Sequence, residues 1–373
     1  MTAKYRAAVI GLGRMGSTFD DEKSVWDRAT RPHAHTPCYL AAGVEVIAGA
    51  DPHDGQREAY RRKWGIGNLY ADYREMLDKE RPDIVSICTT AKPRARVLLD
   101  AVEASASRGL KAIWAEKPIA ISLAEGDQMV AACREAGIAL AIGCSRAWCP
   151  IYNQMRDLIG LGELGDLLQV IGLGQVTMSA NGSHLITTVN RLAKGRVAWL
   201  FGHASSDEQA AGEEDLEGNG YFQYDNGVQG FARMMASGGA SWEFEAIGTR
   251  GRLRAIADGQ QVQFYKTTAS TLEGRRDEPA QQIFPVPRST ESRNTRTVRD
   301  LIACIETGKE PNCSGEDGLH ALEVAIAIRE SHRRGGTRVE LPLEDRSLKI
   351  LSSETLRGDE PAAIRRARSA GSR

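Results

Sequence analysis

Three glycines near the N-terminus have a spacing that could hold a phosphate-bearing ligand. Gly11, Gly13 and Gly16 follow the apolar run 7–10 in the pattern G-x-G-x-x-G. The first glycine permits a tight turn, the second lets a pyrophosphate approach the backbone, and the third lets a helix pack closely on the preceding strand. The unpaired N–H groups at the start of that helix would face the phosphates. We expect this turn to contact a dinucleotide through Gly11, Gly13, Arg14, Met15 and Gly16.

The same spacing occurs again at 160–165, in a different context. Residues 152–159 before it are helix-like, and the apolar run 167–173 follows it. The order is helix, turn and strand, whereas a dinucleotide turn joins a strand to a helix. The second copy therefore predicts an ordinary turn.

A carboxylate stands at the end of the second predicted strand. Asp51 follows the strand-like residues 43–50, and no Lys or Arg comes directly after it. A carboxylate here can accept hydrogen bonds from an adenosine ribose diol and would repel a 2′-phosphate, so we expect NAD rather than NADP. The alternative is an ordinary turn residue. Asp51 lies 40 positions after Gly11, where about 20 is usual, and residues 17–37 are interpreted as an inserted loop.

Two further side chains could move a proton. Lys117 follows the strand-like run 110–115 within a Glu-Lys-Pro sequence. An amine partly removed from water beside a nicotinamide ring can exchange a proton near neutrality. His184 follows Gly182 and Ser183 and precedes an apolar helical stretch, and an imidazole can take a hydroxyl proton as hydride leaves the carbon. The alternatives are a solvated surface lysine and a histidine that caps a helix.

Four more residues are candidates for binding a substrate. Asn181 could orient the substrate or the nearby histidine. Arg146 and Trp148 follow the last strand of the first half and could bind sugar hydroxyls and stack on a ring, and packing explains Trp148 equally well. His35 lies in the inserted loop and could reach a pocket from above, with a plain surface position as the alternative.

The elements that must position these residues alternate between strand and helix up to about residue 144. Near-continuous apolar strands separated by helices predict a parallel sheet covered on both faces. Ligands of such sheets lie at the carboxyl ends of the strands, so Thr89, Thr90 and Glu116 join Lys117 as expected cofactor contacts. The predicted elements are strands 83–88, 110–115 and 138–144 and helices 95–105 and 123–135.

From residue 150 the pattern changes to successive strand-like stretches with few helices. Asn226-Gly227 between two such stretches predicts a hairpin, so we expect an open, mostly antiparallel sheet. Two helices, at 290–306 and after a capping box at Ser314, close this part of the chain. The expected organisation is a dinucleotide-binding domain at 1–146, a substrate-binding and oligomerisation domain at 147–350 and a disordered tail at 351–373.

Composition excludes several other classes of protein. Of 373 residues, 42% are hydrophobic and 26% charged, and the formal net charge is −1, so no broad field attracts nucleic acid or an anionic membrane. No run has the roughly 18 apolar residues of a membrane span, and the N-terminus lacks a signal-peptide shape. With seven scattered cysteines, these features predict a cytoplasmic protein. The sequence contains no H-E-x-x-H or C-x-x-C pattern for a metal and no G-x-S-x-G of a serine hydrolase.

Several motifs together resemble the glucose–fructose oxidoreductase / inositol dehydrogenase (Gfo/Idh/MocA) family over most of the chain. They are the glycine turn, Asp51, and the segments 87–90, 116–118, 162–165, 181–184, 248–251 and 314–318. The resemblance implies a Rossmann domain followed by an α/β domain whose sheet carries the substrate pocket and often makes the subunit interface. It implies NAD(P)-dependent chemistry on sugars, inositols or related polyols. It also implies that Lys117 is the active-site lysine and His184 the histidine at a helix start of the second domain.

The sequence departs from the family pattern in three respects. Ala180 and Thr187 stand where members often carry aspartates close to the histidine. Thr89-Thr90, followed by Arg94, replaces a usual Thr-Pro and histidine. These departures weigh against a His–Asp relay and ordinary alcohol oxidation.

The combined prediction is an NAD-dependent oxidoreductase that moves a hydride between nicotinamide and a carbinol carbon of a sugar, cyclitol or related polyol. Lys117 and His184 would handle the hydroxyl proton, and the C-terminal sheet would join subunits into a dimer or tetramer. One alternative is tightly bound NAD recycled within a net isomerisation, elimination or glycoside cleavage. Another is a nucleotide-sensing protein without turnover, which the missing aspartates favour.

Overall fold

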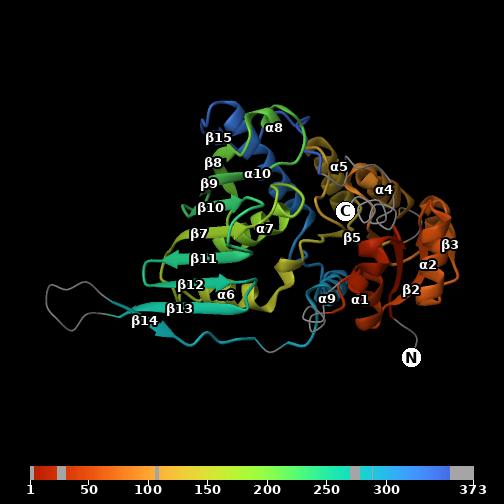
Figure 1. Ribbon diagram of the computed structural model, residues 1–373. Helices are drawn as coiled ribbons and strands as arrows, with labels where there is room; N and C mark the ends of the chain where they lie inside the picture. Colours follow the sequence, from red (N-terminus) through yellow and green to blue (C-terminus); the bar gives the residue numbers. More distant parts are fainter. Residues whose placement is uncertain (1–3, 23–30, 106–108, 269–277, 288, 353–373) are drawn as a thin grey trace, which may run out of the picture. The chain divides into compact units, whose positions relative to one another are not determined.

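The computed structural model describes residues 4–22, 31–105, 109–268, 278–287 and 289–352 (Figure 1). Within it the chain divides into two compact units. The first unit comprises Met1–Ser145 and Thr290–Leu319, and the second comprises Arg146–Ser289 and His320–Leu351.

The first unit is built on a six-stranded sheet in which all neighbouring strands are parallel. The order β3-β2-β1-β4-β5-β6 is that of a doubly wound Rossmann sheet. Most strand residues are apolar and buried, as coverage by helices on both faces requires, so the predicted parallel sheet is confirmed. The strands are β1 (Arg6–Ile10), β2 (Glu45–Ala50), β3 (Leu69–Tyr70), β4 (Ile84–Ile87), β5 (Ala112–Ala115) and β6 (Ala139–Ile142).

The helices of the first unit include one from late in the sequence. Residues 290–319 belong to this unit, whereas the predicted boundary put them in the second domain. The reason is contact, because α9 packs against α1 and β6, and Ile142 N donates to Cys313 O at 2.9 Å. These helices are α1 (His35–Ala41), α2 (Asp54–Trp64), α3 (Tyr73–Glu80), α4 (Ala91–Ser105), α5 (Leu123–Glu135) and α9 (Arg293–Thr307).

The segment after the glycine turn differs from the predicted helix start and inserted loop. A single helical turn, Arg14–Thr18, is followed by a second, Phe19–Glu22, and α1 begins only at His35. The predicted loop at 17–37 is therefore wrong at both ends, because its first and last residues are helical. Residues 23–30 lie outside the described part of the chain.

The second unit is built on a nine-stranded sheet of order β14-β13-β12-β11-β7-β10-β9-β8-β15. Its described neighbours pair antiparallel except β7 and β10, which are parallel. The predicted hairpin is confirmed, since β9 and β10 pair around Gly227, whose φ is +87°. The strands are β7 (Leu167–Gly174), β8 (Val197–Ala204), β9 (Gly218–Tyr224), β10 (Gln229–Met234), β11 (Glu243–Gly248), β12 (Gly251–Ile256), β13 (Gln261–Thr268), β14 (Glu278–Gln282) and β15 (Val339–Glu340).

Helices α6 (Pro150–Gly160), α7 (Gly182–Ala193) and α8 (Asp207–Ala211) belong to the second unit. The second G-x-G-x-x-G copy joins α6 to β7, so the predicted plain turn is confirmed. Helix α10 (Gly315–Arg333) begins in the first unit and continues in the second. Its predicted capping box is present, because Ser314 and Asp317 exchange hydrogen bonds of 3.1 and 3.2 Å.

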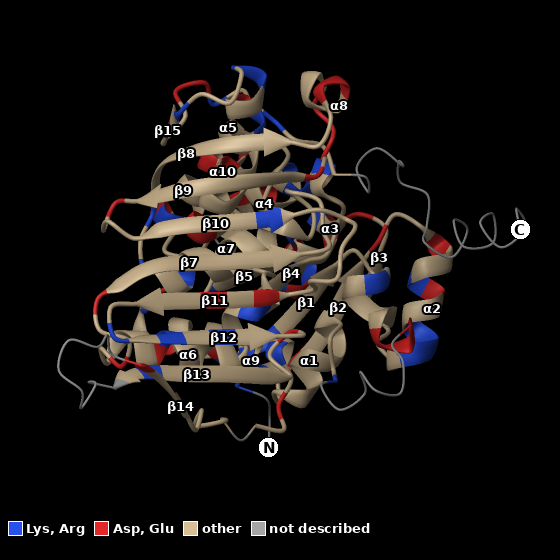
Figure 2. Cartoon of the chain, turned by 60° about the vertical axis from the view of Figure 1, so that its left-hand side comes forward, with Lys and Arg blue, Asp and Glu red and all other residues tan. Residues whose placement is uncertain are grey.

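The faces of the nine-stranded sheet differ in burial. Along β9 and β10, buried residues alternate with half-exposed ones, as the period of two in a strand requires. Helix α7 packs on β7 and β10. Figure 2 shows that charged residues are few along these strands, and β7, β8 and β9 contain no Lys, Arg, Asp or Glu. Of the predicted tail at 351–373, all but the first two residues lie outside the described part of the chain.

Candidate active site

The glycine turn has the backbone geometry that a dinucleotide needs. Gly11 has a φ of +90°, in the left-handed region that favours glycine, and its N–H donates to Ala50 O at the end of β2 (2.8 Å). A Cβ at Gly16 would lie 2.1 Å from Gly11 O, so a side chain cannot fit there. A Cβ at Gly13 would meet nothing within 4 Å. The space beside Gly13 is where a pyrophosphate can approach the backbone.

The side chain of Arg14 is engaged with the segment that follows the turn. Its Nε donates to Glu22 Oε2 at 2.8 Å, and its guanidinium lies 4.9 Å from the centre of the Phe19 ring. Met15 is half-buried. The side chain of Arg14 is therefore held by Glu22 and Phe19, and cofactor contact through Arg14 and Met15 stays a prediction.

Asp51 is connected directly to the glycine turn. Its side chain is buried, Oδ2 accepts the N–H of Leu12 at 3.0 Å, and Oδ1 accepts the N–H of His53 at 3.0 Å. Each carboxylate oxygen can accept a second hydrogen bond. Asp51 thus has the acceptors that a ribose diol requires. It is also hydrogen-bonded to Leu12, within the turn that would hold the pyrophosphate.

Thr89 and Thr90 follow β4 after Cys88, and the end of β4 lies beside that of β1. The Oγ1 atom of Thr89 is buried and makes no hydrogen bond with any described residue. Such a group normally has a partner, and a cofactor atom would supply one. Arg94, which sequence reasoning noted only as a departure, is 2% exposed and donates to the carbonyls of Thr89 and Pro118. The residues at this edge of the sheet therefore fit an adenine dinucleotide.

The Glu-Lys-Pro segment follows β5, with Lys117 half-buried and Glu116 buried. The Oε1 atom of Glu116 lies 3.1 Å from Nε2 of His35. Burial favours the neutral acid, but the hydrogen bond from His35 and the charges of Lys117 and Arg94 hold the pKa of Glu116 below its ordinary value. The carboxylate of Glu116 is thus used inside the protein, and contact of this residue with the cofactor stays a prediction.

His35 is not in an exposed loop. It is the first residue of α1, and its side chain has no exposed surface. Its ring stacks on Trp114 of β5, with 3.4 Å between centroids, and Nδ1 lies 2.9 Å from Ser86 Oγ of β4. Burial lowers the pKa of His35, which favours the neutral ring. The expectation that His35 reaches a substrate from above is therefore corrected.

The positions of the protons can be assigned along the buried series of hydrogen bonds that joins Glu116, His35 and Ser86. An ionised Glu116 can only accept, so Nε2 of His35 carries a hydrogen, and the neutral ring leaves Nδ1 as an acceptor. Ser86 then donates its hydroxyl to Nδ1, and Tyr39, whose pKa burial raises, donates its own hydroxyl to Ser86 Oγ at 2.8 Å. The hydrogen bonds thus run in one direction, from Tyr39 through Ser86 and His35 to Glu116.

In the second unit, Trp242 brings together two of the predicted site residues. His184 lies in the first turn of α7, and its ring meets the Trp242 ring edge-to-face with 6.0 Å between centroids. The guanidinium of Arg146 lies 3.3 Å from the centre of the same indole. Trp242 has a φ of +55°, which is uncommon outside glycine and concentrated at functional sites. Asn181 is exposed and occupies the N-cap position, so His184 is not the cap.

Asp215 holds the loop that leads into α7. Its carboxylate accepts hydrogen bonds from Thr177 Oγ1 (2.6 Å) and from the N–H groups of Ser179 and Ala180 (both 2.8 Å). Burial raises the pKa of Asp215. Position 180 lacks the aspartate of the family pattern, and here its backbone is bound by a carboxylate from a distant part of the sequence. No local pattern pointed to Asp215.

Arg146 and Trp148 are more enclosed than expected. Trp148 is 2% exposed, which supports packing over ring stacking with a sugar. Arg146 donates from Nε and Nη2 to the two oxygens of Asp258, both at 3.0 Å, and Tyr152 donates its hydroxyl to the same carboxylate at 2.8 Å. The guanidinium is therefore fixed by Asp258 and Trp242.

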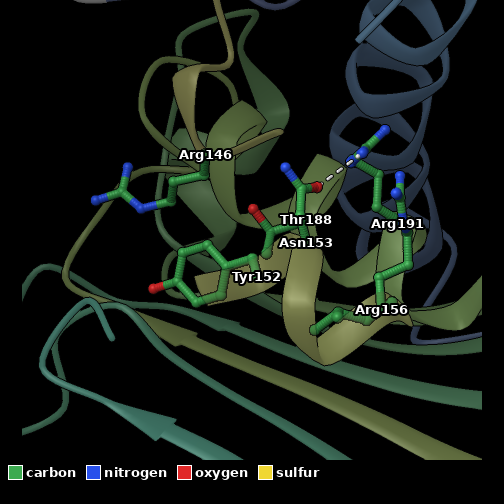
Figure 3. Close-up of a pocket in the computed structure, with 7 residues that line it drawn as sticks. Arg146, Tyr152, Asn153, Arg156, Thr188 and Arg191 are labelled. Carbon is green, nitrogen blue, oxygen red and sulfur yellow. Dashed lines mark hydrogen bonds between the residues drawn. The ribbon is translucent and has the colours of Figure 1, made fainter. Parts of the chain in front are cut away.

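Arg146 also lines a small pocket between α6 and α7, with about 200 Å³ of empty space that includes open solvent. In Figure 3, Asn153 of α6 and Arg191 of α7 face each other, joined by a hydrogen bond of 3.3 Å. Thr188, another lining residue, donates its hydroxyl to the carbonyl of His184 at 2.7 Å. The pocket and His184 thus share helix α7.

The predicted site residues fall into two groups. The glycine turn, Asp51, Thr89 and Lys117 lie in the first unit, whereas Arg146 and His184 lie in the second. The first group was predicted to bind the cofactor and the second to bind the substrate. The joint action of Lys117 and His184 stays a prediction.

Both units match models of known domains. Residues 5–144 match the oxidoreductase family with an NAD-binding Rossmann fold, and residues 174–341 match the C-terminal alpha/beta domain of the same family. The chain belongs to the Gfo/Idh/MocA oxidoreductase family. The family resemblance of the sequence motifs is therefore confirmed.

Named relatives are similar to this chain along most of their length. D-apiose dehydrogenase of Paraburkholderia graminis is 29% identical over 324 residues, which cover 79% of this chain and 83% of the relative. Myo-inositol 2-dehydrogenase of Thermotoga maritima is 21% identical over 348 residues, 87% of this chain and 96% of the relative. The aldose–aldose oxidoreductase of Caulobacter crescentus, solved with glycerol, has the same fold, with a TM-score of 0.72, 21% identity and coverage of 91% and 100%.

No described helix is long and apolar enough to cross a membrane. Within the same residues, no group of three or more His, Cys, Asp or Glu side chains is arranged to hold a metal ion.

Proposed function

We propose that this family member transfers a hydride between NAD and a carbinol carbon of a sugar, cyclitol or related polyol. The observation that carries the proposal lies in the first unit. The glycine turn, Asp51, Thr89 and Lys117 each follow the carboxyl end of a parallel strand, β1, β2, β4 and β5 respectively. Ligands of such sheets bind at that edge. The named relatives, which act on D-apiose and myo-inositol, support the polyol class.

Bound NAD supplies the hydride acceptor. The amine of Lys117 and the imidazole of His184 exchange the proton of the substrate hydroxyl and stabilise the charge that develops on its oxygen. Either group can act as the base. Asn181 and Arg146, both in the second unit, orient the substrate through its hydroxyl groups.

We propose NAD rather than NADP as the cofactor. The carboxylate of Asp51 stands where a ribose diol is bound in this fold and would repel a 2′-phosphate. The nearby basic residue Arg57 donates to the carbonyl of Asp51 and pairs with Asp54, so its guanidinium is held by those oxygens.

The test is a substrate panel with NAD and NADP in turn. Purified protein is mixed with myo-inositol, scyllo-inositol, D-apiose and a set of aldoses and sugar acids, and formation of the reduced nicotinamide is followed by absorbance. Turnover of at least one polyol with NAD is expected. Binding of NADH without conversion of any compound would contradict the proposal and support a nucleotide-sensing protein.

The departures near His184 favour one second candidate. Because position 180 is alanine and position 187 is threonine, neither supplies a carboxylate to His184. The Thr187 hydroxyl donates to Ser183 O at 2.8 Å, and the N–H of Ala180 donates to Asp215. In the second candidate, NAD stays bound and is reduced and reoxidised within one net isomerisation, elimination or glycoside cleavage. Nicotinamide dinucleotide released on denaturing the purified protein, together with product formed without net NADH, would support it.

We also propose that the chain acts as a homo-oligomer. Trp199 and Phe201 of β8 and Tyr221 of β9 form an aromatic cluster with ring centroids 5.5 to 6.5 Å apart. Phe201 is 42% exposed, and β7, β8 and β9 contain no ionisable Lys, Arg, Asp or Glu. An exposed aromatic cluster on strands β8 and β9, which carry no Lys, Arg, Asp or Glu of their own, favours association with a second copy of that surface.

A further inference from the structure

We infer that His35 is a positioning residue for Lys117 and acts through the carboxylate of Glu116. The inference rests on the proposed function, in which Lys117 exchanges the substrate proton. His35 itself has no exposed surface and touches neither substrate nor cofactor. Its effect on chemistry must therefore pass through Glu116, the residue that precedes Lys117.

The carboxylate of Glu116 is confined from two sides. Its Oε1 atom accepts the Nε2–H of His35 at 3.1 Å, and a Cβ at Gly143, just after β6, would lie 3.0 Å from that same oxygen. Its Oε2 atom accepts the backbone N–H of Lys117 at 3.3 Å. One oxygen is thus held by His35 and given space by Gly143, while the other reaches the backbone of Lys117.

The ring of His35 is itself fixed by the two neighbouring strands. Ser86 of β4 and Trp114 of β5 are register partners, and the ring stacks on the indole while its Nδ1 accepts the Ser86 hydroxyl. Glu116 lies two residues beyond Trp114, on the same face by the period of a strand. The ring cannot turn without losing the stacking contact and both hydrogen bonds.

Loss of the His35 donor would leave a buried carboxylate incompletely satisfied. Such a group reorients or takes up a proton, and either change would move the peptide N–H of Lys117 and alter the charge beside its amine. Proton exchange depends on placement of the group to within about 1 Å. The hydrogen bond from His35 to Glu116 thus controls the placement of Lys117 for proton exchange.

The first experiment compares three variants with wild type, using the panel compound that turns over fastest with NAD. His35→Leu keeps the bulk but has no donor, and we expect kcat to fall by about 10-fold to 100-fold with NAD affinity within about twofold of wild type. His35→Gln places an amide N–H near the position of Nε2, and we expect it to restore kcat to within about threefold. Thr297→Val, which removes a buried hydroxyl bonded to Arg293 O in α9, is the matched control and should leave kcat unchanged.

A merely structural role predicts another pattern. His35→Leu and His35→Gln would then lower the melting temperature alike, with kcat per folded molecule unchanged, and that result would overturn the inference. Gly143→Ala gives an independent test from the other side of the carboxylate. We expect it to lower kcat without any change at His35.

The second experiment asks whether His35 acts through Lys117. In a Lys117→Ala background, His35→Leu should cause no further loss of kcat, whereas an additive loss would overturn the inference. If Lys117→Ala alone keeps full activity, the proposed function of Lys117 fails instead, and the two failures are distinguished.

A third measurement needs no substrate. Reductive methylation by formaldehyde and borohydride is followed at Lys117 by peptide mass spectrometry, with the other lysines of the same sample as internal references. The relative rate at Lys117 should change by about threefold or more in His35→Leu and stay at the wild-type value in His35→Gln. Equal rates in all three proteins would overturn the inference even if no panel compound is converted.

Discussion

The amine of Lys117 follows a buried carboxylate at the end of a parallel strand, where this fold binds ligands. Lys117→Ala removes the amine while leaving the glycine turn and Asp51 intact. We expect kcat to fall by about 100-fold or more, in line with the contribution of general acid–base catalysis. NAD affinity should stay within about twofold, as measured by quenching of intrinsic fluorescence. Unchanged turnover would remove Lys117 from the mechanism.

The preference for NAD depends at the same scale on Asp51. Asp51→Ser removes two acceptors of a ribose diol and the charge that repels a 2′-phosphate. A hydrogen bond to a charged group contributes about 1.5–3 kcal/mol, so we expect NAD to bind roughly tenfold or more weakly and the ratio of NAD to NADP affinity to fall. Titration of both cofactors checks this. Gln56→Ser, at a half-buried position of α2 nearby, is a control that should leave the ratio unchanged, and an unaltered ratio in Asp51→Ser would exclude the ribose role.

Individual residues show where sequence reasoning works and where it stops. The glycine turn and its close packing were predictable because their spacing is local and each glycine has a steric reason. Trp242, Asp215 and the true place of His35 were not, because each depends on partners far away in the sequence. His35 lies 51 positions from Ser86 and 81 from Glu116, and nothing in its neighbours indicates those contacts.

At the scale of elements, helix α1 joins the segment after the glycine turn to strands β4 and β5 through a buried histidine. An unfolded chain binds a proton on this imidazole below its ordinary pKa of 6.5, whereas burial lowers the pKa of His35 in the folded protein. The unfolded state therefore binds more protons in that window, and stability is lost as pH falls through it. The loss is about 1.4 kcal/mol for each pH unit within the window.

Urea unfolding at pH 8, 7, 6 and 5.5 tests this expectation. We expect the free energy of unfolding of wild type to fall below pH 7 more steeply than that of His35→Gln, so the difference between the two proteins narrows as pH decreases. The other histidines are common to both and cancel. A constant difference over this range would show that the ring of His35 titrates alike in the folded and unfolded states.

Element types were easier to predict than their grouping. Apolar runs and helical periodicity identified most strands of both sheets and located helix α5 at 123–135, whereas the short strands β3, β14 and β15 were not predicted. The unit to which α9 belongs could not be read in the same way, because an apolar stripe on a helix does not say which surface it covers. Its contacts with α1 and β6 decide that question. In the nine-stranded sheet, the parallel pairing of β7 with β10 is likewise a long-range contact that no hairpin signal reveals.

At the scale of the whole molecule, the proposed subunit contact is a property of a sheet face rather than of one residue. Phe201 is 42% exposed and lies in the aromatic cluster with Trp199 and Tyr221. Phe201→Glu places a charge on that face, and burying an unpaired carboxylate in an interface costs several kcal/mol. We expect the mass measured by light scattering to fall from that of a dimer or tetramer to that of a single 40.6 kDa chain.

The control for this prediction is another exposed apolar residue away from the face. Leu161, in the turn after α6, is 75% exposed, and Leu161→Glu should leave the mass unchanged because no interface is proposed there. NAD binding should persist in both variants, since the glycine turn and Asp51 belong to the other unit. A Phe201→Glu protein that keeps the wild-type mass would exclude this face as the subunit contact. If wild type is itself a single chain, the proposal of a homo-oligomer fails while the proposed chemistry at Lys117 stands untouched.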